Sequence, residues 1–462
     1  MRCRYRLEGR SSPVSAILLL LGFAPVALSQ AGAPHWVATW GTAQQLLRLQ
    51  GGGRGAGGRG PQGPAAQNPS PPVPAAAPGR GPQRRFGIPP ALSGVTNQTV
   101  RMIVRTSIGG QTVRVRLSSA LGGTSVALGA ARIAIRAAGS AIVPGSDRVL
   151  TFSGKPAATL YAGELLVSDP VNLNVTPLSD VAISLYFPGE TGPPTSHTFG
   201  LRPTYISKEG DFTAAPEIAD PAGTTQSYYW LAGIDVLAPA QSAAIVTFGD
   251  SITDGDQSTP DTNGMWPAVL AARLQANKAT AHIAVVNAGI SGNRILGDNN
   301  GGVVRLLHDA LSVPGVKWIT LLEGINDITG ATRSAQQGTS FGADNLIAAY
   351  RQVIETAHLY DVKVIGCTIT PFGESNVFTD RGEAIREAVN DWTRTSGAFD
   401  GVVDFDAATR DPQDPKRFRP EADSPDMLHP GDAGYKLMAA AIDLSMFGTK
   451  AAAKPKKKKQ AR

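Results

Sequence analysis

From Ala243 onward the chain alternates short apolar segments with amphipathic ones, and few folds accommodate that pattern. The first pair is AAIVTF (243–248) followed by WPAVLAARLQAN (266–277). Such alternation predicts a parallel sheet with helices on both faces. The later predicted strands are IAVVNAG, VKWITLLEG, VKVIGCTIT and GVVDFD, and the later predicted helices are 303–311, ADNLIAAYRQVIETAHLY, GEAIREAVNDWTRTS and GDAGYKLMAAAIDL.

Polar motifs follow these predicted strands, at the sheet edge where ligands bind in such folds. GDS, ending in Ser251, comes after the first strand, and NAGISGNR, with Gly292, spans the end of the second. GIND, with Asn326, follows the third, and DMLH, with Asp426 and His429, precedes the last helix. Because the carboxyl ends of parallel strands meet at one edge, these residues are predicted to lie together.

The residue types in this set suit acyl transfer, which needs a nucleophile, a base, a group that orients the base, and oxyanion donors. His429 can take the proton of the Ser251 hydroxyl, and Asp426, three residues earlier, can hold the imidazole tautomer. The backbone N–H groups of Ser251 and Gly292 and the side-chain amide of Asn326 supply three predicted oxyanion donors.

Each motif taken alone has an ordinary structural explanation. GDS is a common turn sequence, Asp426 could cap a turn, and GIND could be a plain exit from a strand. The set is more informative than its members, because four polar motifs occur at successive strand ends or before the last helix. Coincidence explains that arrangement poorly.

The motifs FGDSITDG, NAGISGN, LLEGINDI and DMLHPGDAGY resemble the four conserved blocks of the SGNH (GDSL-type) hydrolase family. Over 243–447 this resemblance implies a flavodoxin-like three-layer α/β/α domain with esterase or lipase activity. It also implies Ser251 as nucleophile, Gly292 and Asn326 as oxyanion donors, and Asp426 with His429 completing the triad. GDSIT lacks the G-x-S-x-G elbow of α/β-hydrolases, as the resemblance leads one to expect.

Residues 97–238 have the pattern of an all-β, sandwich-like domain. TVRVRL (112–117) alternates strictly, and SIGGQ (107–111) before it has the composition of a hairpin turn. Three segments resemble secreted arylesterase/acylhydrolase-like proteins, some of them associated with xylan degradation: WVATWGTAQ, VRMIVRTSIGGQTVRVRLSSALG and WLAGIDVLAP. His197 is a loop histidine in this region, and such residues are more often structural or exposed than catalytic.

Three segments fall outside the predicted domains. Residues 1–29 combine a basic start with an apolar run and small residues before Gln30, which predicts a cleaved signal peptide and a secreted or periplasmic protein. The alternative is a membrane anchor, for which the apolar run is short. Residues 51–90 are Gly/Pro/Arg-rich and predicted to be a disordered insertion, and 450–462 form a basic, disordered tail.

The net charge of +6 comes from the ends of the chain. Residues 1–29 carry +3 and residues 450–462 carry +7, so 30–449 sum to −4. This balance argues against a nucleic-acid-binding domain. The lysine tail is predicted to be solvated, with contact to anionic surfaces as the alternative.

Cysteine and histidine usage points to no disulfide, metal or cofactor. Cys3 leaves with the signal peptide, and Cys367 lies in an apolar strand, where a buried thiol is expected. The remaining histidines show no metal-ligand spacing: His282, His308 and His358. No cofactor is needed for the predicted chemistry.

The sequence therefore predicts a secreted serine esterase that acts through an acyl-enzyme. The expected substrates are short acyl groups on carbohydrate or small alcohols, including polysaccharide esters. One alternative is a lipase or arylesterase acting on longer or aromatic esters. The other is a catalytically inactive carbohydrate-binding protein.

Overall fold

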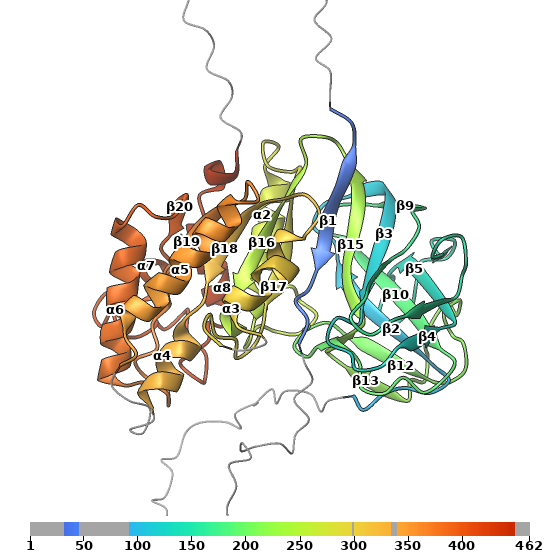
Figure 1. Cartoon of the computed structure of the whole chain (residues 1–462), viewed down its shortest axis with the longest axis horizontal. Helices are drawn as coiled ribbons and strands as arrows, with labels where there is room; N and C mark the ends of the chain where they lie inside the picture. Colours follow the sequence, from blue (N-terminus) through green and yellow to red (C-terminus); the bar gives the residue numbers. More distant parts are fainter. Residues whose placement is uncertain (1–31, 46–91, 298–299, 334–339, 449–462) are drawn as a thin grey trace, which may run out of the picture.

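The computed structural model describes residues 32–45, 92–297, 300–333 and 340–448. The predicted signal peptide, the insertion and the basic tail lie outside these residues. The described chain has a strand-rich part and an α/β part that lie side by side (Figure 1). No helix among the described residues is long and apolar enough to span a bilayer.

The α/β part is built on a five-stranded sheet in which every pair of neighbours is parallel, as the alternation predicted. The strand order is β17-β16-β18-β19-β20, which is 2-1-3-4-5 in chain order and matches the flavodoxin-like arrangement. The chain reverses its direction of winding between β16 and β18. The strands are β16 (Ala243–Gly249), β17 (Ile283–Gly289), β18 (Val316–Leu322), β19 (Lys363–Cys367) and β20 (Gly401–Val403).

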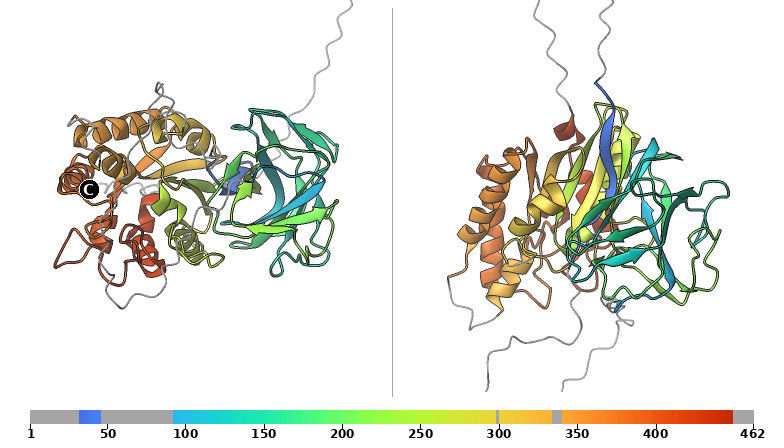
Figure 2. Two further views of the ribbon diagram at one scale, coloured as in Figure 1. Left: turned by 90° about the horizontal axis from the view of Figure 1, so that it is seen from below. Right: turned by 45° about the vertical axis from the view of Figure 1, so that its right-hand side comes forward.

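Helices cover both faces of this sheet (Figure 2). α2 and α7 pack against α8 in one group, and α3, α5, α6 and α4 form a connected group in the other. Since both faces are covered, every residue of β16 is buried. The helices are α1 (Ser251–Asp254), α2 (Trp266–Ala276), α3 (Gly302–Leu306), α4 (Ile325–Thr332), α5 (Ala343–His358), α6 (Asp380–Thr395), α7 (Phe405–Thr409) and α8 (Asp432–Ala441), with a π-helical turn at Leu307–Leu311 and a 3₁₀ turn at Leu444–Phe447.

The strand-rich part contains two larger antiparallel sheets. Their inward side chains share one apolar core, which includes Val100, Val115, Ile183 and Trp230. The first sheet holds β1 (His35–Gly41), β15 (Leu231–Ala238), β3 (Gly110–Ser118), β8 (Leu165–Val167) and β9 (Val171–Val175). The second holds β13 (Gly223–Thr225), β12 (Thr204–Glu209), β2 (Gln98–Arg105), β10 (Asp180–Phe187), β5 (Ala130–Ile135) and β6 (Arg148–Val149). Two small pairs complete it: β4 (Val126–Leu128) with β7 (Ala158–Leu160), and β11 (Ser196–His197) with β14 (Tyr228–Tyr229).

The hairpin predicted at SIGGQ is wrong, because β2 and β3 belong to different sheets. The connecting residues cross from one sheet to the other and are held by Thr39 of β1. The Thr39 carbonyl accepts hydrogen bonds from the backbone N–H and the hydroxyl of Ser107. Two alternating strands joined by a Gly-rich turn give the same sequence signal whether they pair or face each other across a core.

Strand β1 lies outside the range 97–238 but belongs to the same strand-rich part. It pairs with β15 along six positions and lies between β15 and the edge strand β17 of the α/β sheet (Figure 1). The Ala38 N–H donates to the Pro314 carbonyl at 2.9 Å, and Val285 N–H donates to Ser107 Oγ at 3.1 Å. The two parts of the chain therefore share backbone hydrogen bonds as well as a packed boundary.

Candidate active site

Ser251 lies at the first turn after β16, at the carboxyl edge of the parallel sheet. Asp250 caps the short helix α1, because its carboxylate accepts the Ile252 N–H at 3.0 Å. The turn is tight: a side chain at Gly249 would lie 2.5 Å from the Leu322 carbonyl oxygen. Ser251 itself is 5% exposed, so its hydroxyl is held in a largely desolvated position.

His429 and Asp426 approach Ser251 from the segment before α8. Nε2 of His429 lies 2.7 Å from Ser251 Oγ, although 178 positions separate the two residues. Nδ1 of His429 lies 2.7 Å from Asp426 Oδ2. The other Asp426 oxygen accepts from the N–H groups of Leu428 and His429, each at 3.0 Å. The structure thus brings the three predicted residues into a continuous Ser–His–Asp chain.

The electrostatic setting of this chain favours a protonated imidazole. Burial alone would raise the pKa of Asp426, but its hydrogen bond from His429 and the charge of that ring hold the pKa well below its usual range. Burial alone would lower the pKa of His429, yet the carboxylates of Asp426, Asp256 and Asp250 outweigh it and raise that pKa. An imidazolium formed during reaction is therefore stabilised where it forms.

The three predicted oxyanion donors have N–H groups that are not used elsewhere among the described residues. No hydrogen bond within the described residues uses the backbone N–H of Ser251 or of Gly292. Gly292 has φ +76°, a left-handed conformation that glycine adopts without strain. Asn326, in the first turn of α4, donates one amide N–H to the Asn293 carbonyl at 2.8 Å, and its second N–H remains. That bond holds Asn326 against the Gly292 loop.

Arg305 of α3 joins the loops that carry these donors. Its guanidinium donates to the carbonyl oxygens of Gly249 (2.9 Å) and Ala288 (2.8 Å), and to Asn293 Oδ1 (2.8 Å). It also forms ion pairs with Glu323 and Asp309 and lies over the Phe248 ring. One buried cation therefore ties together the ends of β16, β17 and β18.

Buried carboxylates near Arg305 accept hydrogen bonds from backbone N–H groups. Asp327 accepts the N–H groups of Ile295 and Leu296, each at 3.0 Å. Burial raises the pKa of Asp327 to about 6 and that of Asp250 to about 7, and it raises the pKa of Glu323 well above its usual range. Asp250 and Asp327 thus hold strand-end loops through backbone N–H groups.

A serine hydroxyl bonded to a histidine, with a carboxylate on the far ring nitrogen, is an arrangement that can carry out acyl transfer. Together with a doubly wound sheet this defines the class of α/β hydrolytic domains that use a serine nucleophile. Residues 247–437 match the model of the GDSL-like Lipase/Acylhydrolase family. The α/β part of the chain is accordingly similar to the GDSL-like lipase/acylhydrolase (SGNH) family over these residues.

Several solved structures resemble the same part. They include a putative lipolytic protein of the G-D-S-L family from Desulfitobacterium hafniense DCB-2, at 22% identity over 43% of this chain and 97% of that one, with a TM-score of 0.32. An acetyl xylan esterase from Geobacillus stearothermophilus matches at 23% identity over 45% and 94%, with a TM-score of 0.34. The aryl esterase of M. Smegmatis matches at 15% identity over 43% and 96%, with a TM-score of 0.34. No curated protein matches the chain.

The sequence analysis did not identify Asp256, Arg305 or the contact between His197 and Asp254. Asp256 lies in the GDS motif region, and its carboxylate is 3.8 Å from His429 Nε2. The sequence feature that could have identified Asp256 is its position five residues after Ser251. Among the described residues, no group of three or more His, Cys, Asp or Glu is arranged to hold a metal ion.

Cys367 is buried, and its thiol lies 3.9 Å from the Ile365 carbonyl oxygen. Burial raises the pKa of this thiol above its usual range. Cys367 is therefore a core residue of β19, as its apolar surroundings in the sequence indicated.

Proposed function

We propose that the protein is a secreted serine esterase that hydrolyses carboxylic esters through an acyl-enzyme. Ser251 Oγ attacks the ester carbonyl while its proton passes to His429 Nε2. The oxyanion is held by the N–H groups of Ser251 and Gly292 and by the Asn326 amide. The tetrahedral intermediate collapses, and the alkoxide leaves with the proton from His429. Water then attacks the acyl-enzyme, again through His429, and releases the acid and the serine hydroxyl.

The observation that carries this proposal is the 2.7 Å contact between Ser251 Oγ and His429 Nε2, continued at 2.7 Å to Asp426. A serine hydroxyl with an ordinary structural role does not need a buried, carboxylate-oriented imidazole. The family match over 247–437 supports the same reading.

The proposed substrates are short acyl esters, such as acetate, on carbohydrate or small alcohols. This choice rests on the resemblance of the N-terminal segments WVATWGTAQ and WLAGIDVLAP to secreted arylesterase/acylhydrolase-like proteins. Export is proposed from the basic and apolar pattern of residues 1–29. Polysaccharide esters outside the cell are substrates consistent with both the resemblance and the proposed export.

The test is hydrolysis of p-nitrophenyl acetate, butyrate and octanoate, and of acetylated xylan, by the mature protein. We expect the short esters to be cleaved and a Ser251→Ala variant to fall to background. Ser312→Ala, which removes an exposed hydroxyl bonded to the His308 carbonyl, is the matched control and should keep wild-type rates. Preference for octanoate would favour the lipase alternative. A folded wild type that is inert on every ester, or a Ser251→Ala variant as active as wild type, would contradict the proposal.

A further inference from the structure

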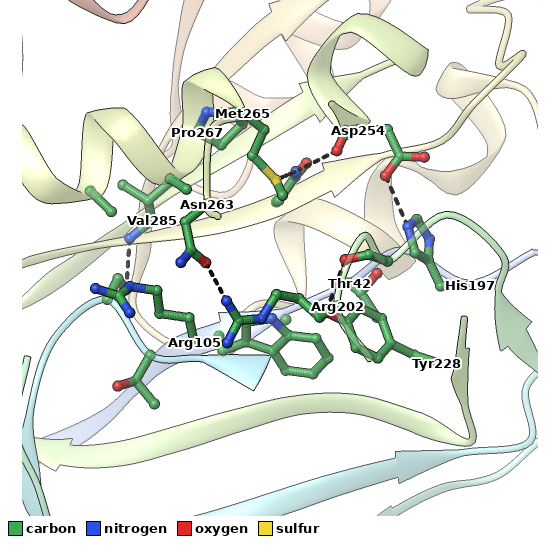
Figure 3. Close-up of a pocket in the computed structure, with 18 of the residues that line it drawn as sticks. Thr42, Arg105, His197, Arg202, Tyr228, Asp254, Asn263, Met265, Pro267 and Val285 are labelled. Carbon is green, nitrogen blue, oxygen red and sulfur yellow. Dashed lines mark hydrogen bonds and ion pairs between the residues drawn. The ribbon is translucent and has the colours of Figure 1, made fainter. Parts of the chain in front are cut away.

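His197 belongs to the strand-rich part, yet its ring contacts the helix that begins at the nucleophile. Nε2 of His197 lies 2.9 Å from Oδ1 of Asp254, the last residue of α1 (Figure 3). Nδ1 lies 2.7 Å from the carbonyl oxygen of Ala43. A carbonyl can only accept, so Nδ1 carries a proton, and Nε2 faces a carboxylate. A hydrogen bond between Nε2 and the Asp254 carboxylate therefore requires a second proton, in addition to the one on Nδ1.

The second oxygen of Asp254 reaches the oxyanion loop. Oδ2 accepts the backbone N–H of Ser291 at 2.8 Å, and Ser291 precedes Gly292 in the chain. The loop lies directly on α1 here, because a side chain at Gly289 would come within 2.3 Å of the Asp254 nitrogen. One carboxylate thus connects the histidine of the strand-rich part, the helix of Ser251 and the loop of Gly292.

Both members of the pair are buried: the side chain of His197 is 4% exposed and that of Asp254 is 3% exposed. A buried carboxylate without a cationic partner is strongly disfavoured. Burial alone would lower the pKa of His197, but the charge and hydrogen bond of Asp254 outweigh this and raise it. His197 is therefore the buried ion-pair partner of Asp254.

The same residues line a pocket between the two parts of the chain (Figure 3). The charged group of Arg202 in that lining is already bonded, to Asn263 at 3.0 Å and in an ion pair to Asp180 at 2.6 Å. The charge of Arg202 is thus already paired with groups of the protein.

We infer that His197, acting through Asp254, is a positioning residue for the oxyanion loop, so that the strand-rich part completes the active site of the α/β part. This inference rests on the proposed esterase function. It assigns His197 no contact with substrate. Without the link, the Ser291 N–H next to Gly292 loses its anchor. An oxyanion donor displaced by about 1 Å can cost on the order of 100-fold in rate.

The test compares kcat and KM for p-nitrophenyl acetate in four variants. Asp254→Ala removes both hydrogen bonds, and we expect kcat to fall by about 10- to 100-fold with KM nearly unchanged. His197→Ala should lower kcat by about 10-fold. Asp254→Asn should keep most of the activity, because its oxygen can accept from Ser291 and its NH2 can donate to a neutral His197. Rescue by this isosteric variant separates positioning from charge.

Arg136→Ala is the matched control, because it breaks a different connection between the two parts. Arg136 donates two hydrogen bonds of 2.9 Å to Asp261 and contacts neither Asp254 nor Ser291. We expect it to lower the melting temperature without changing kcat. Hydrogen exchange in peptides covering 286–296 should accelerate in His197→Ala and stay at the wild-type rate in Arg136→Ala.

The inference is overturned if His197→Ala and Asp254→Ala, both folded, keep the wild-type kcat, or if Arg136→Ala loses kcat to the same extent. If the alanine variants do not fold, His197→Phe takes their place, since phenylalanine fills the space of the ring but donates to neither Asp254 nor Ala43. A reduced kcat for this variant supports the inference, and an unchanged kcat overturns it. Ser251→Ala in the same series keeps the two questions apart: activity in that variant refutes the esterase proposal, whereas the exchange measurement judges the link alone.

Discussion

The carboxylate of Asp256 lies 3.8 Å from His429 Nε2, the ring nitrogen that faces the Ser251 hydroxyl. His429 is thus flanked by Asp426 on one nitrogen and approached by Asp256 on the other. Tyr435 fixes the Asp256 segment by donating its hydroxyl to the Asp256 carbonyl at 2.5 Å. Two negative charges therefore act on one imidazole, and both favour its protonated form.

This relationship predicts the acidic side of the pH profile. The base must be neutral to accept the serine proton, so kcat/KM rises as pH passes upward through the pKa of His429. That pKa is raised, so the midpoint should lie above about 6.5, the ordinary histidine value. Asp256→Asn removes one raising charge and should move the midpoint to lower pH. The profile is measured as kcat/KM for p-nitrophenyl acetate.

Asp391→Asn is the control for the pH experiment, because Asp391 is exposed on α6 and is no cause of the His429 shift. Its profile should overlay that of wild type. A midpoint that does not move in Asp256→Asn would mean that Asp256 does not act on His429 in solution.

Asp426→Asn should lower kcat by about 10⁴-fold while the protein stays folded. The amide NH2 would donate to Nδ1, so the ring would carry its proton on Nε2 and could not accept from Ser251. The amide oxygen can still accept from the N–H groups of Leu428 and His429, which preserves the turn. Steady-state kinetics measures the loss of kcat, and circular dichroism checks that the variant stays folded. Loss of only a few-fold in kcat would argue that Asp426 has a structural role.

Asn326→Ala tests the proposed oxyanion donor that is a side-chain amide and not a backbone N–H. We expect kcat to fall by about 100- to 1,000-fold with KM changed little, because the amide acts on charge that develops in the transition state. Asn326→Asp is the isosteric companion and should fall at least as far, since it places a carboxylate where negative charge forms. An effect confined to KM would indicate that Asn326 binds substrate without stabilising the oxyanion.

Arg305→Met should destabilise the protein by roughly 3–5 kcal/mol, because it leaves buried Glu323 without its cation and frees the Gly249 and Ala288 carbonyls. Urea denaturation measures the free energy of unfolding. Arg351→Met is the control: this exposed arginine of α5 lies over the Trp392 ring, and its loss should cost less than about 1 kcal/mol. Equal stability of the two variants would contradict the role given to Arg305.

The parallel sheet and the meeting of polar motifs at its edge were predictable, because strand–helix alternation has one common solution and sends every strand end to the same side. Ser251, Gly292 and Asn326 follow from that rule. The hairpin at SIGGQ did not follow, since alternation alone does not say whether β2 and β3 pair or face each other.

The groups that support the site could not be predicted in the same way. Arg305 occurs in a helix with no motif around it, and only the fold brings it to three strand ends. His197 and Asp254 are 57 positions apart and belong to different parts of the chain. Their contact depends on how those parts pack, and neither residue shows a local pattern that encodes it.

The most direct measurement of the central claim is to trap the acyl-enzyme. The mature protein is mixed with p-nitrophenyl acetate, quenched in acid within the first turnover, digested and mapped by mass spectrometry. The account predicts one acetyl group on the peptide that contains Ser251, located on Ser251 itself and absent in Ser251→Ala. An acetyl group on another residue, or hydrolysis that continues in Ser251→Ala, would contradict it.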